Sequence, residues 1–360
     1  MAFFISFLAH HFDLSANAAN FKNLNLTFVQ HYITPAHYSM NTKEKQHAIK
    51  LIKNLFILIV LFFIVDRTLG FLIGYKFEKA EHGDIQTFTH SITNPTEDIF
   101  IYGSSRALHG YDCNVLSQTT GYTSFNNGKE NSTILYHDLI LNQMLKKHVP
   151  KMIILDFAPK ELSWGESENS RSVLANTILP YTIHDSAFAN IARQQFHQEY
   201  IKARLSWLYA YKSAIIPLFN TKKKQEQEQI NGYSPLTGSK VKPKPLDYGN
   251  ETELPDTAAK NTFDAFVQTV VENHIKLYVI HSPIFVKPYA TTQSIDYAKS
   301  VLKKYNIEFW DYAFDTSFYK PELFYDYIHL NETGAALFSK KVGEKIKQEL
   351  NSTTPGFQQP

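Results

Sequence analysis

The sequence contains a single cysteine, Cys113, in 360 residues. One thiol can form neither an internal disulfide nor a cysteine-rich metal site, so both kinds of stabilisation are excluded. We interpret Cys113 as a small buried apolar residue. The sequence also has no His-x-x-x-His or Cys-x-x-Cys spacing of the kind that binds metal ions, and we expect no metal and no cofactor.

The sequence also lacks an excess of one charge. It has 36 Lys and Arg against 34 Asp and Glu, a formal net charge of +2. Proteins that bind nucleic acid concentrate basic residues on one face. The one basic run, residues 222–224, lies in a polar stretch and is typical of a solvated loop. We therefore expect no nucleic acid partner.

Long apolar runs are scarce, and residues 55–65 (LFILIVLFFIV) form the main one. This run is too short to span a bilayer, which takes about 20 residues, but residues 49–75 reach that length. Four lysines precede the apolar run 55–65: Lys43, Lys45, Lys50 and Lys53. They predict a single-pass anchor in the inner (cytoplasmic) membrane with the C-terminal domain extracytoplasmic. The alternatives are a cleaved signal peptide, disfavoured because no small-residue cleavage site follows, and a buried core helix.

The rest of the chain divides by composition. Residues 1–48 are expected to be a cytoplasmic or disordered N-terminal segment. Met40 begins a lead-in typical of a cytoplasmic start, so a second hypothesis places the true translation start at Met40 rather than Met1. We predict a connector over 76–97, an α/β domain over 98–350 with a polar insertion at about 220–261, and a frayed tail over 351–360.

Short apolar segments alternate with helical patterns in this domain. Expected strands cover 98–102, 123–126, 152–157, 275–281 and 307–310. Expected helices cover 105–118, 132–147, 262–273, 292–305 and 333–350, and residues 172–219 are mostly helical in character. This alternation predicts a three-layer α/β/α fold with a mostly parallel, flavodoxin-like sheet. Sites in such sheets lie at the carboxyl ends of the strands.

Gly103-Ser104-Ser105-Arg106 directly follows the first expected strand. A serine on a strand-to-helix turn exposes its hydroxyl, and the N–H groups of the helix start can face a developing oxyanion. Gly103 allows the tight turn. The alternative is that Ser104 or Ser105 only caps the helix.

Asp326 and His329 are three residues apart, just before the last expected helix. This spacing places both side chains on one side of a turn, where Asp326 can orient His329. The free ring nitrogen of His329 could then take a proton from Ser105. The alternative is a surface aspartate beside a packed histidine.

These two motifs resemble the SGNH (GDSL-type) hydrolase superfamily over roughly residues 98–350. Gly103-Ser104-Ser105 matches the Gly-Asp-Ser start, with Ser104 in place of the usual Asp, and Asp326 and His329 match the late Asp-x-x-His block. The nearest overall layout is that of membrane-anchored relatives that modify acyl groups on cell-envelope polymers. The resemblance implies a serine esterase or O-acyltransferase with catalytic Ser105, His329 and Asp326. Its substrate would be an acylated carbohydrate or small ester.

Two further family blocks match less closely. The resemblance implies that Gly128, or the N–H of Asn131, supplies the second oxyanion donor. The asparagine that the family carries after its third strand is missing, because that strand ends in Asp156-Phe157. Asn126, Asn127 or Asn131 would have to substitute, and Arg106 could pair with Asp156.

His281 ends another expected strand, so it either lines the substrate pocket or is a satisfied loop histidine. The rival function is a catalytically inactive SGNH-like binding or assembly factor with envelope-assembly proteins as partners. A third reading is a purely structural membrane protein in which the α/β domain is a spacer.

Overall fold

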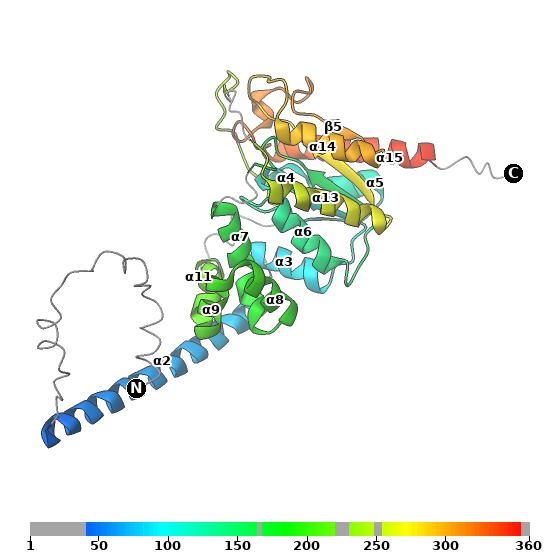
Figure 1. The fold of residues 1–360 in the computed structure, drawn as a ribbon. Coiled ribbons are helices and arrows are strands. Elements are labelled where there is room, and N and C mark those ends of the chain that lie inside the picture. Colours follow the sequence, from blue (N-terminus) through cyan, green and yellow to red (C-terminus); the bar gives the residue numbers. More distant parts are fainter. Residues whose placement is uncertain (1–40, 82, 164–167, 220–229, 248–253, 354–360) are drawn as a thin grey trace, which may run out of the picture. The chain divides into compact units, whose positions relative to one another are not determined.

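The computed structural model describes residues 41–81, 83–163, 168–219, 230–247 and 254–353. The predicted Met40 start and the segment before it lie outside these residues. The chain divides into two units, residues 1–61 and 62–360. The second unit contains a five-stranded sheet of order β2-β1-β3-β4-β5 (Figure 1). Its strands are β1 (Ile99–Tyr102), β2 (Ser124–Asn126), β3 (Met152–Asp156), β4 (Lys276–His281) and β5 (Phe309–Asp311).

All four strand pairings are parallel, which confirms the predicted fold class. The strand order is the flavodoxin-like one, in which the chain reverses direction across the sheet between β1 and β3. Every residue of β1 and β3 is buried, as expected for central strands covered on both faces. The carboxyl ends of β1 and β3 therefore flank the position where this fold class places its sites.

Side chains of alternating residues pack into two separate cores. Phe100, Tyr102 and Ile153 face one core, and Ile99, Ile101 and Ile154 face the other. The first core is covered mainly by α3 (Gly83–Thr93), α6 (Ile134–Met144), α13 (Thr257–Glu272) and α14 (Gln293–Lys304), and Figure 1 shows α6 and α13 side by side. The second is covered by α4 (Ser105–Gly110), α5 (Cys113–Thr120) and α15 (Glu332–Thr353). The buried Cys113 belongs to this second core.

The helix expected over 105–118 is two helices. Tyr111 is extended, and Asp112 caps α5 by accepting hydrogen bonds from the N–H groups of Asn114 and Val115. An aspartate cap stabilises a new helix start, so the chain breaks there although the apolar pattern continues. The break leaves α4 short, and it turns the Tyr111 side chain into the second core.

The expected connector over 76–97 contains helix α3. Its polar sequence gave no helical signal, yet Phe88 and Ser91 are buried and Phe88 packs near Tyr136 of α6. Residues 230–247 likewise differ from the exposed excursion expected there, because Tyr233 and Ser234 are buried. Tertiary packing overrides local composition in both segments.

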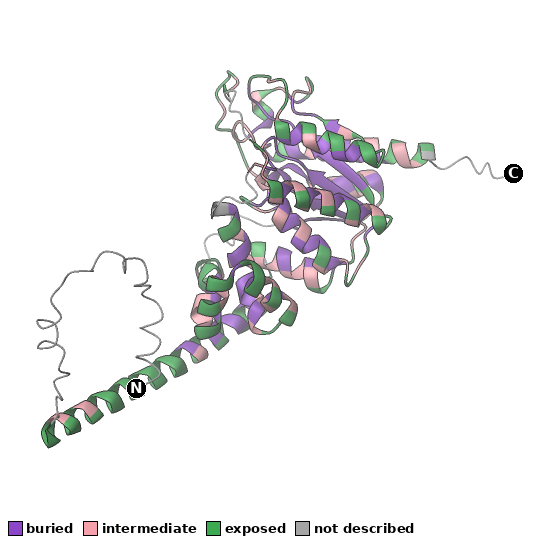
Figure 2. Cartoon of the chain, in the orientation of Figure 1, coloured by how far each residue is buried: buried purple, intermediate pink, exposed green. Residues whose placement is uncertain are grey.

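Helix α2 (Thr42–Glu78) is long and apolar enough to cross a membrane by length and composition. Residues 49–65 are exposed on all sides, and Figure 2 shows this stretch in green. The helices that follow β3 are α7 (Glu168–Ile178), η2 (Leu179–Ile183), α8 (Ser186–Gln195), α9 (His197–Leu205), α10 (Trp207–Ala210) and α11 (Lys212–Phe219). From Asp66 onward one side of α2 is buried against η2, α10 and α11.

The buried side of α2 is specific in its contacts. Asp66 accepts hydrogen bonds from the Ser206 hydroxyl and from the N–H groups of Trp207 and Leu208, at the start of α10. A Cβ on Gly70 would lie 2.4 Å from the Cβ of Trp207. The uniformly exposed stretch therefore ends near Val65, ten residues before the predicted end of the span, because the rest of α2 is partly covered by protein.

Candidate active site

Ser105 sits where the sequence predicted, one turn beyond the end of β1. Gly103 has a φ of +147°, and a Cβ there would lie 2.9 Å from the backbone oxygen of Asp156. Only glycine fits this turn without strain. Ser104 occupies the N-cap position of α4, but its side chain makes no capping hydrogen bond to the described residues. Ser105 is half-buried, so its hydroxyl remains accessible.

Asp326, His329 and Ser105 form a continuous hydrogen-bonded chain. The Asp326 carboxylate lies 2.9 Å from His329 Nδ1, and His329 Nε2 lies 2.7 Å from Ser105 Oγ. Because the carboxylate can only accept, Nδ1 carries the proton and Nε2 is left to accept from the serine hydroxyl. The two motifs, 224 residues apart, therefore meet at one edge of the sheet with the polarity that serine activation requires.

Asp326 is itself held in place. Its Oδ1 accepts hydrogen bonds from the backbone N–H groups of Ile328 and His329, both at 3.0 Å. Burial opposes ionisation of the Asp326 carboxyl, but the hydrogen bond and charge of His329 and these two N–H groups outweigh it and lower its pKa. Asp326 is therefore ionised at neutral pH.

A second histidine, which the sequence analysis missed, lies against His329. The His109 ring meets the His329 ring edge-on, with centroids 5.7 Å apart and planes at 90°. His109 Nδ1 lies 2.6 Å from the Ser234 carbonyl, and Nε2 lies 2.8 Å from the Glu130 carboxylate. A sequence signal exists, because His109 is one helical turn after Ser105 on α4. The Ser234 contact links the site to the polar insertion.

The expected oxyanion donors are largely engaged elsewhere. The N–H of Gly128 donates to Asn126 Oδ1 at 2.8 Å, and the N–H of Asn127 donates to the Ile101 carbonyl at 2.7 Å. The Asn127 side chain accepts from the Ser91 hydroxyl of α3. The backbone N–H groups of Gly128 and Asn127 therefore hold the loop after β2 and are not free for a substrate oxygen, and Asn127 Nδ2 is buried without a partner among the described residues.

Asn126 and Asn131 have different surroundings. Asn126 is buried, and its amide donates to the carbonyls of Ala107 and Tyr111, so it cannot substitute for the missing family asparagine. Asn131 is exposed and left-handed, with φ of 56°. Its loop lies beside the turn that carries the serine, because the Lys129 N–H donates to the Gly103 carbonyl at 3.1 Å. Asn131 is therefore the one predicted donor with room to turn toward Ser105.

Arg106 points away from the serine and into the protein. Its guanidinium lies 2.7 Å from Asp156 Oδ1, and the Tyr111 hydroxyl donates to Asp156 Oδ2 at 2.8 Å. Both members of the ion pair are almost completely buried. The pairing that the sequence suggested is thus present, and it neutralises the acid at the end of β3. Asp156 also acts on a second acid: burial and the charge of Asp156 raise the pKa of Glu161 to about 8.

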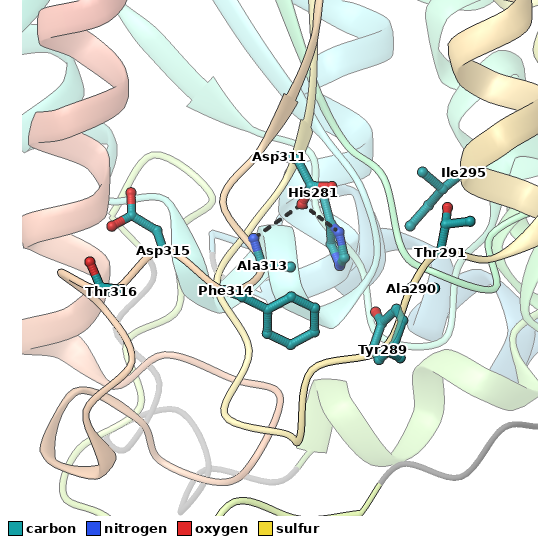
Figure 3. Close-up of a pocket in the computed structure, with 10 residues that line it drawn as sticks. All are labelled: His281, Tyr289, Ala290, Thr291, Ile295, Asp311, Ala313, Phe314, Asp315 and Thr316. Atoms are coloured by element: carbon teal, nitrogen blue, oxygen red, sulfur yellow. Dashed lines mark hydrogen bonds and ion pairs between the residues drawn. The ribbon is translucent and has the colours of Figure 1, made fainter.

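His281 is not hydrogen-bonded to Ser105 or His329. It ends β4, and its Nδ1 lies 3.1 Å from Asp311 at the end of β5. Its ring lines a cavity of about 440 Å³ formed by the loops after these two strands (Figure 3). One nitrogen of His281 is therefore bonded, and the ring also lines a cavity.

No family model and no curated protein matches the chain. Among solved structures, one described as a candidate platelet activating factor from Streptococcus pneumonia is 11% identical, with a TM-score of 0.37. The match covers 84% of this chain and 99% of that one. An acetyl xylan esterase, AlAXEase, is 10% identical with a TM-score of 0.34, covering 70% of this chain and 99% of that one. Scores this low carry no argument about activity, so the functional proposal depends on the geometry of the site.

Proposed function

We propose that this chain is a membrane-anchored serine esterase or O-acyltransferase with Ser105 as its nucleophile. The observation that carries the proposal is the chain of hydrogen bonds from Asp326 through His329 to Ser105. A serine hydroxyl needs a base within hydrogen-bond reach and an orienting group behind that base. His329 lies 2.7 Å from Ser105, and Asp326 lies 2.9 Å from His329.

The first half of the reaction forms an acyl-enzyme. Ser105 Oγ bonds to the ester carbonyl carbon while its proton passes to His329 Nε2, and the carbonyl electron pair moves onto oxygen. The resulting imidazolium is stabilised by Asp326. Collapse of the oxyanion breaks the ester C–O bond, and His329 returns the proton to the departing alcohol oxygen. Water or a hydroxyl of an acceptor then releases the acyl group by the same steps.

The oxyanion must be stabilised by N–H donors, and few such groups near Ser105 are free. The N–H of Ser105 lies in the first turn of α4, where helical N–H groups have no partner within the helix. Asn131 is the proposed second donor, because the backbone N–H groups of Gly128 and Asn127 are engaged in the loop and the Asn127 side chain is buried. Since removing one oxyanion donor typically costs about 10²–10³ in rate, the second donor matters to the turnover.

The proposed substrate is an acylated carbohydrate of the cell envelope. This step rests on the motif resemblance and on the apolar helix ahead of the domain, which together favour a site held near a membrane. The rival proposal, an inactive binding or assembly factor with envelope proteins as partners, is favoured by the absence of the usual asparagine after β3, where Asp156 stands instead.

A fluorophosphonate probe separates these two functions. We expect full-length protein in detergent to be labelled covalently, because only an activated serine attacks phosphorus at a useful rate. Labelling should disappear in Ser105→Ala and in His329→Ala and persist in Ser300→Ala, which alters an exposed serine outside the site. Equal, weak labelling of all four proteins would rule out the esterase and favour the binding factor.

For localisation we propose a single pass through the inner (cytoplasmic) membrane with the domain outside. The exposed stretch 49–65 rises about 25 Å as a helix, close to the thickness of the hydrocarbon core, and four lysines lie before or within its first turns, ahead of the apolar run 55–65. Protease added to intact spheroplasts should therefore digest a C-terminal tag and spare one placed before Lys43. Protection of the C-terminal tag would reverse the topology.

A further inference from the structure

The cavity at the ends of β4 and β5 contains a histidine prepared to accept a hydrogen bond. His281 is 1% exposed, and its Nδ1 faces the Asp311 carboxylate at 3.1 Å. Because a carboxylate only accepts, Nδ1 is the protonated nitrogen and Nε2 presents a lone pair. Burial lowers the pKa of His281 despite the opposing charge of Asp311, so the ring is neutral. Nε2 has no partner among the described residues.

An orphan acceptor in a buried position is costly unless something donates to it. Figure 3 shows the His281 ring bonded to Asp311 at one end and directed at the other end toward Phe314 and Tyr289. The rings of Tyr289 and Phe314 meet edge to face, with centroids 5.2 Å apart and planes at 85°. The orphan nitrogen therefore faces a recess with aromatic walls.

The charges around the cavity favour neither an anionic nor a cationic ligand. Its carboxylates, Asp311 and Asp315, disfavour an anion. Both are already balanced by cations: Asp315 lies 2.6 Å from Lys341, and Asp311 lies 3.7 Å from Lys299. A cation therefore gains little there. A neutral ligand with hydroxyl donors and an apolar face fits the remaining chemistry, and this describes a pyranose ring.

The cavity is also close to the proposed nucleophile. Two strand spacings separate the end of β4 from the end of β1, about 10 Å. The loop that carries Asp326 and His329 is joined to the segment after β4, because the Phe285 N–H donates to the Tyr327 carbonyl at 2.7 Å. Tyr327 and Ile328 also pack against a small apolar cluster that contains the cavity-lining Ala313. Its volume of about 440 Å³ is within the range of small-molecule sites.

We propose that this cavity is a carbohydrate subsite in which a sugar hydroxyl donates to His281 Nε2 and the sugar ring packs on Phe314 and Tyr289. The subsite deepens the proposed function, on which its catalytic meaning rests, by naming where the carbohydrate part of the ester or acceptor binds. Thr291 and Thr316 line the cavity and add further polar groups at its rim. As a binding site it exists independently of Ser105.

Binding is measured directly with methyl β-D-glucopyranoside as the probe. The protein is the full-length Ser105→Ala chain in a sugar-free detergent, and the readout is saturation-transfer NMR with titration. We expect His281→Phe and Phe314→Ala to weaken binding at least tenfold, because each removes one of the two contact types. His281→Gln, which restores an acceptor, should stay within about threefold of the parent.

The matched control is Tyr305→Ala, in a separate cavity of about 390 Å³ at the amino ends of the strands, and it should not change binding. No binding by the parent, equal binding of glycerol, or retained binding in both His281→Phe and Phe314→Ala would overturn the subsite. Because fluorophosphonate labelling reports Ser105 alone, labelling without sugar binding removes only the subsite. Sugar binding without labelling removes only the esterase.

Discussion

Replacement of Ser105 or His329 by alanine is expected to reduce kcat for hydrolysis of a small acetyl ester by about 10⁶-fold. The two losses should be nearly equal and should not add in the double variant, because nucleophile and base act as one unit across the 2.7 Å contact. Initial rates with 4-nitrophenyl acetate measure this effect. His197→Ala, on an exposed histidine of α9, is the matched control and should keep full activity.

Asp326→Asn should cost less, about 10⁴-fold. Its amide can donate to His329 Nδ1, which favours the tautomer with a proton on Nε2, and that nitrogen can then no longer accept from Ser105. The same carboxyl group also makes the folding stability depend on pH. The pKa of Asp326 is lowered in the folded state, so its contribution to stability is present above its unfolded pKa and is lost as pH falls through the folded value. Parental activity at pH 7 in Asp326→Asn would contradict the role given to this residue.

The sheet could be predicted from sequence because its signals are local and repeated. The central strands β1 and β3 are short apolar runs buried on both faces, and Gly103-Ser104-Ser105 marks a turn whose backbone needs glycine. The pairing of Asp326 with His329 could be predicted for the same reason, since three residues of spacing bring them together in any turn. What joined the two motifs was the parallel topology, which places strand ends at one edge.

The features that sequence reasoning missed depend on distant contacts. The Gly128 N–H donates to Asn126 two residues before it, a local contact, but the Asn126 side chain is oriented by the distant carbonyls of Ala107 and Tyr111. His109 is positioned by Ser234, 125 residues away, in a segment whose polarity suggested an exposed loop. Tertiary packing decides which N–H groups are free to face an oxyanion and which groups contact His109. The proposed nucleophile and base, in contrast, could be predicted from local sequence patterns.

The ion pair behind the serine is expected to dominate the stability of the domain. Arg106 and Asp156 are 5% and 0% exposed, so solvent screens their interaction little. Removing one partner leaves an uncompensated buried charge, which typically destabilises by about 3–5 kcal/mol. Arg106→Met should therefore lower the urea midpoint of the full-length protein in detergent strongly, and Asp156→Asn should also lower it, although its amide can still bond to Arg106 and Tyr111.

The double variant Arg106→Met/Asp156→Asn tests whether charge is the cause. With both charges removed, no unpaired ion remains, and the double variant should be more stable than Arg106→Met alone. The conservative Glu308→Gln, at a side chain 68% exposed, should leave the free energy of unfolding within about 0.5 kcal/mol of the parent value. Additive losses in the double variant would mean that Arg106 and Asp156 stabilise the fold through separate contacts. The turn holding Ser105 would then depend on Gly103 and packing rather than on the charge behind it.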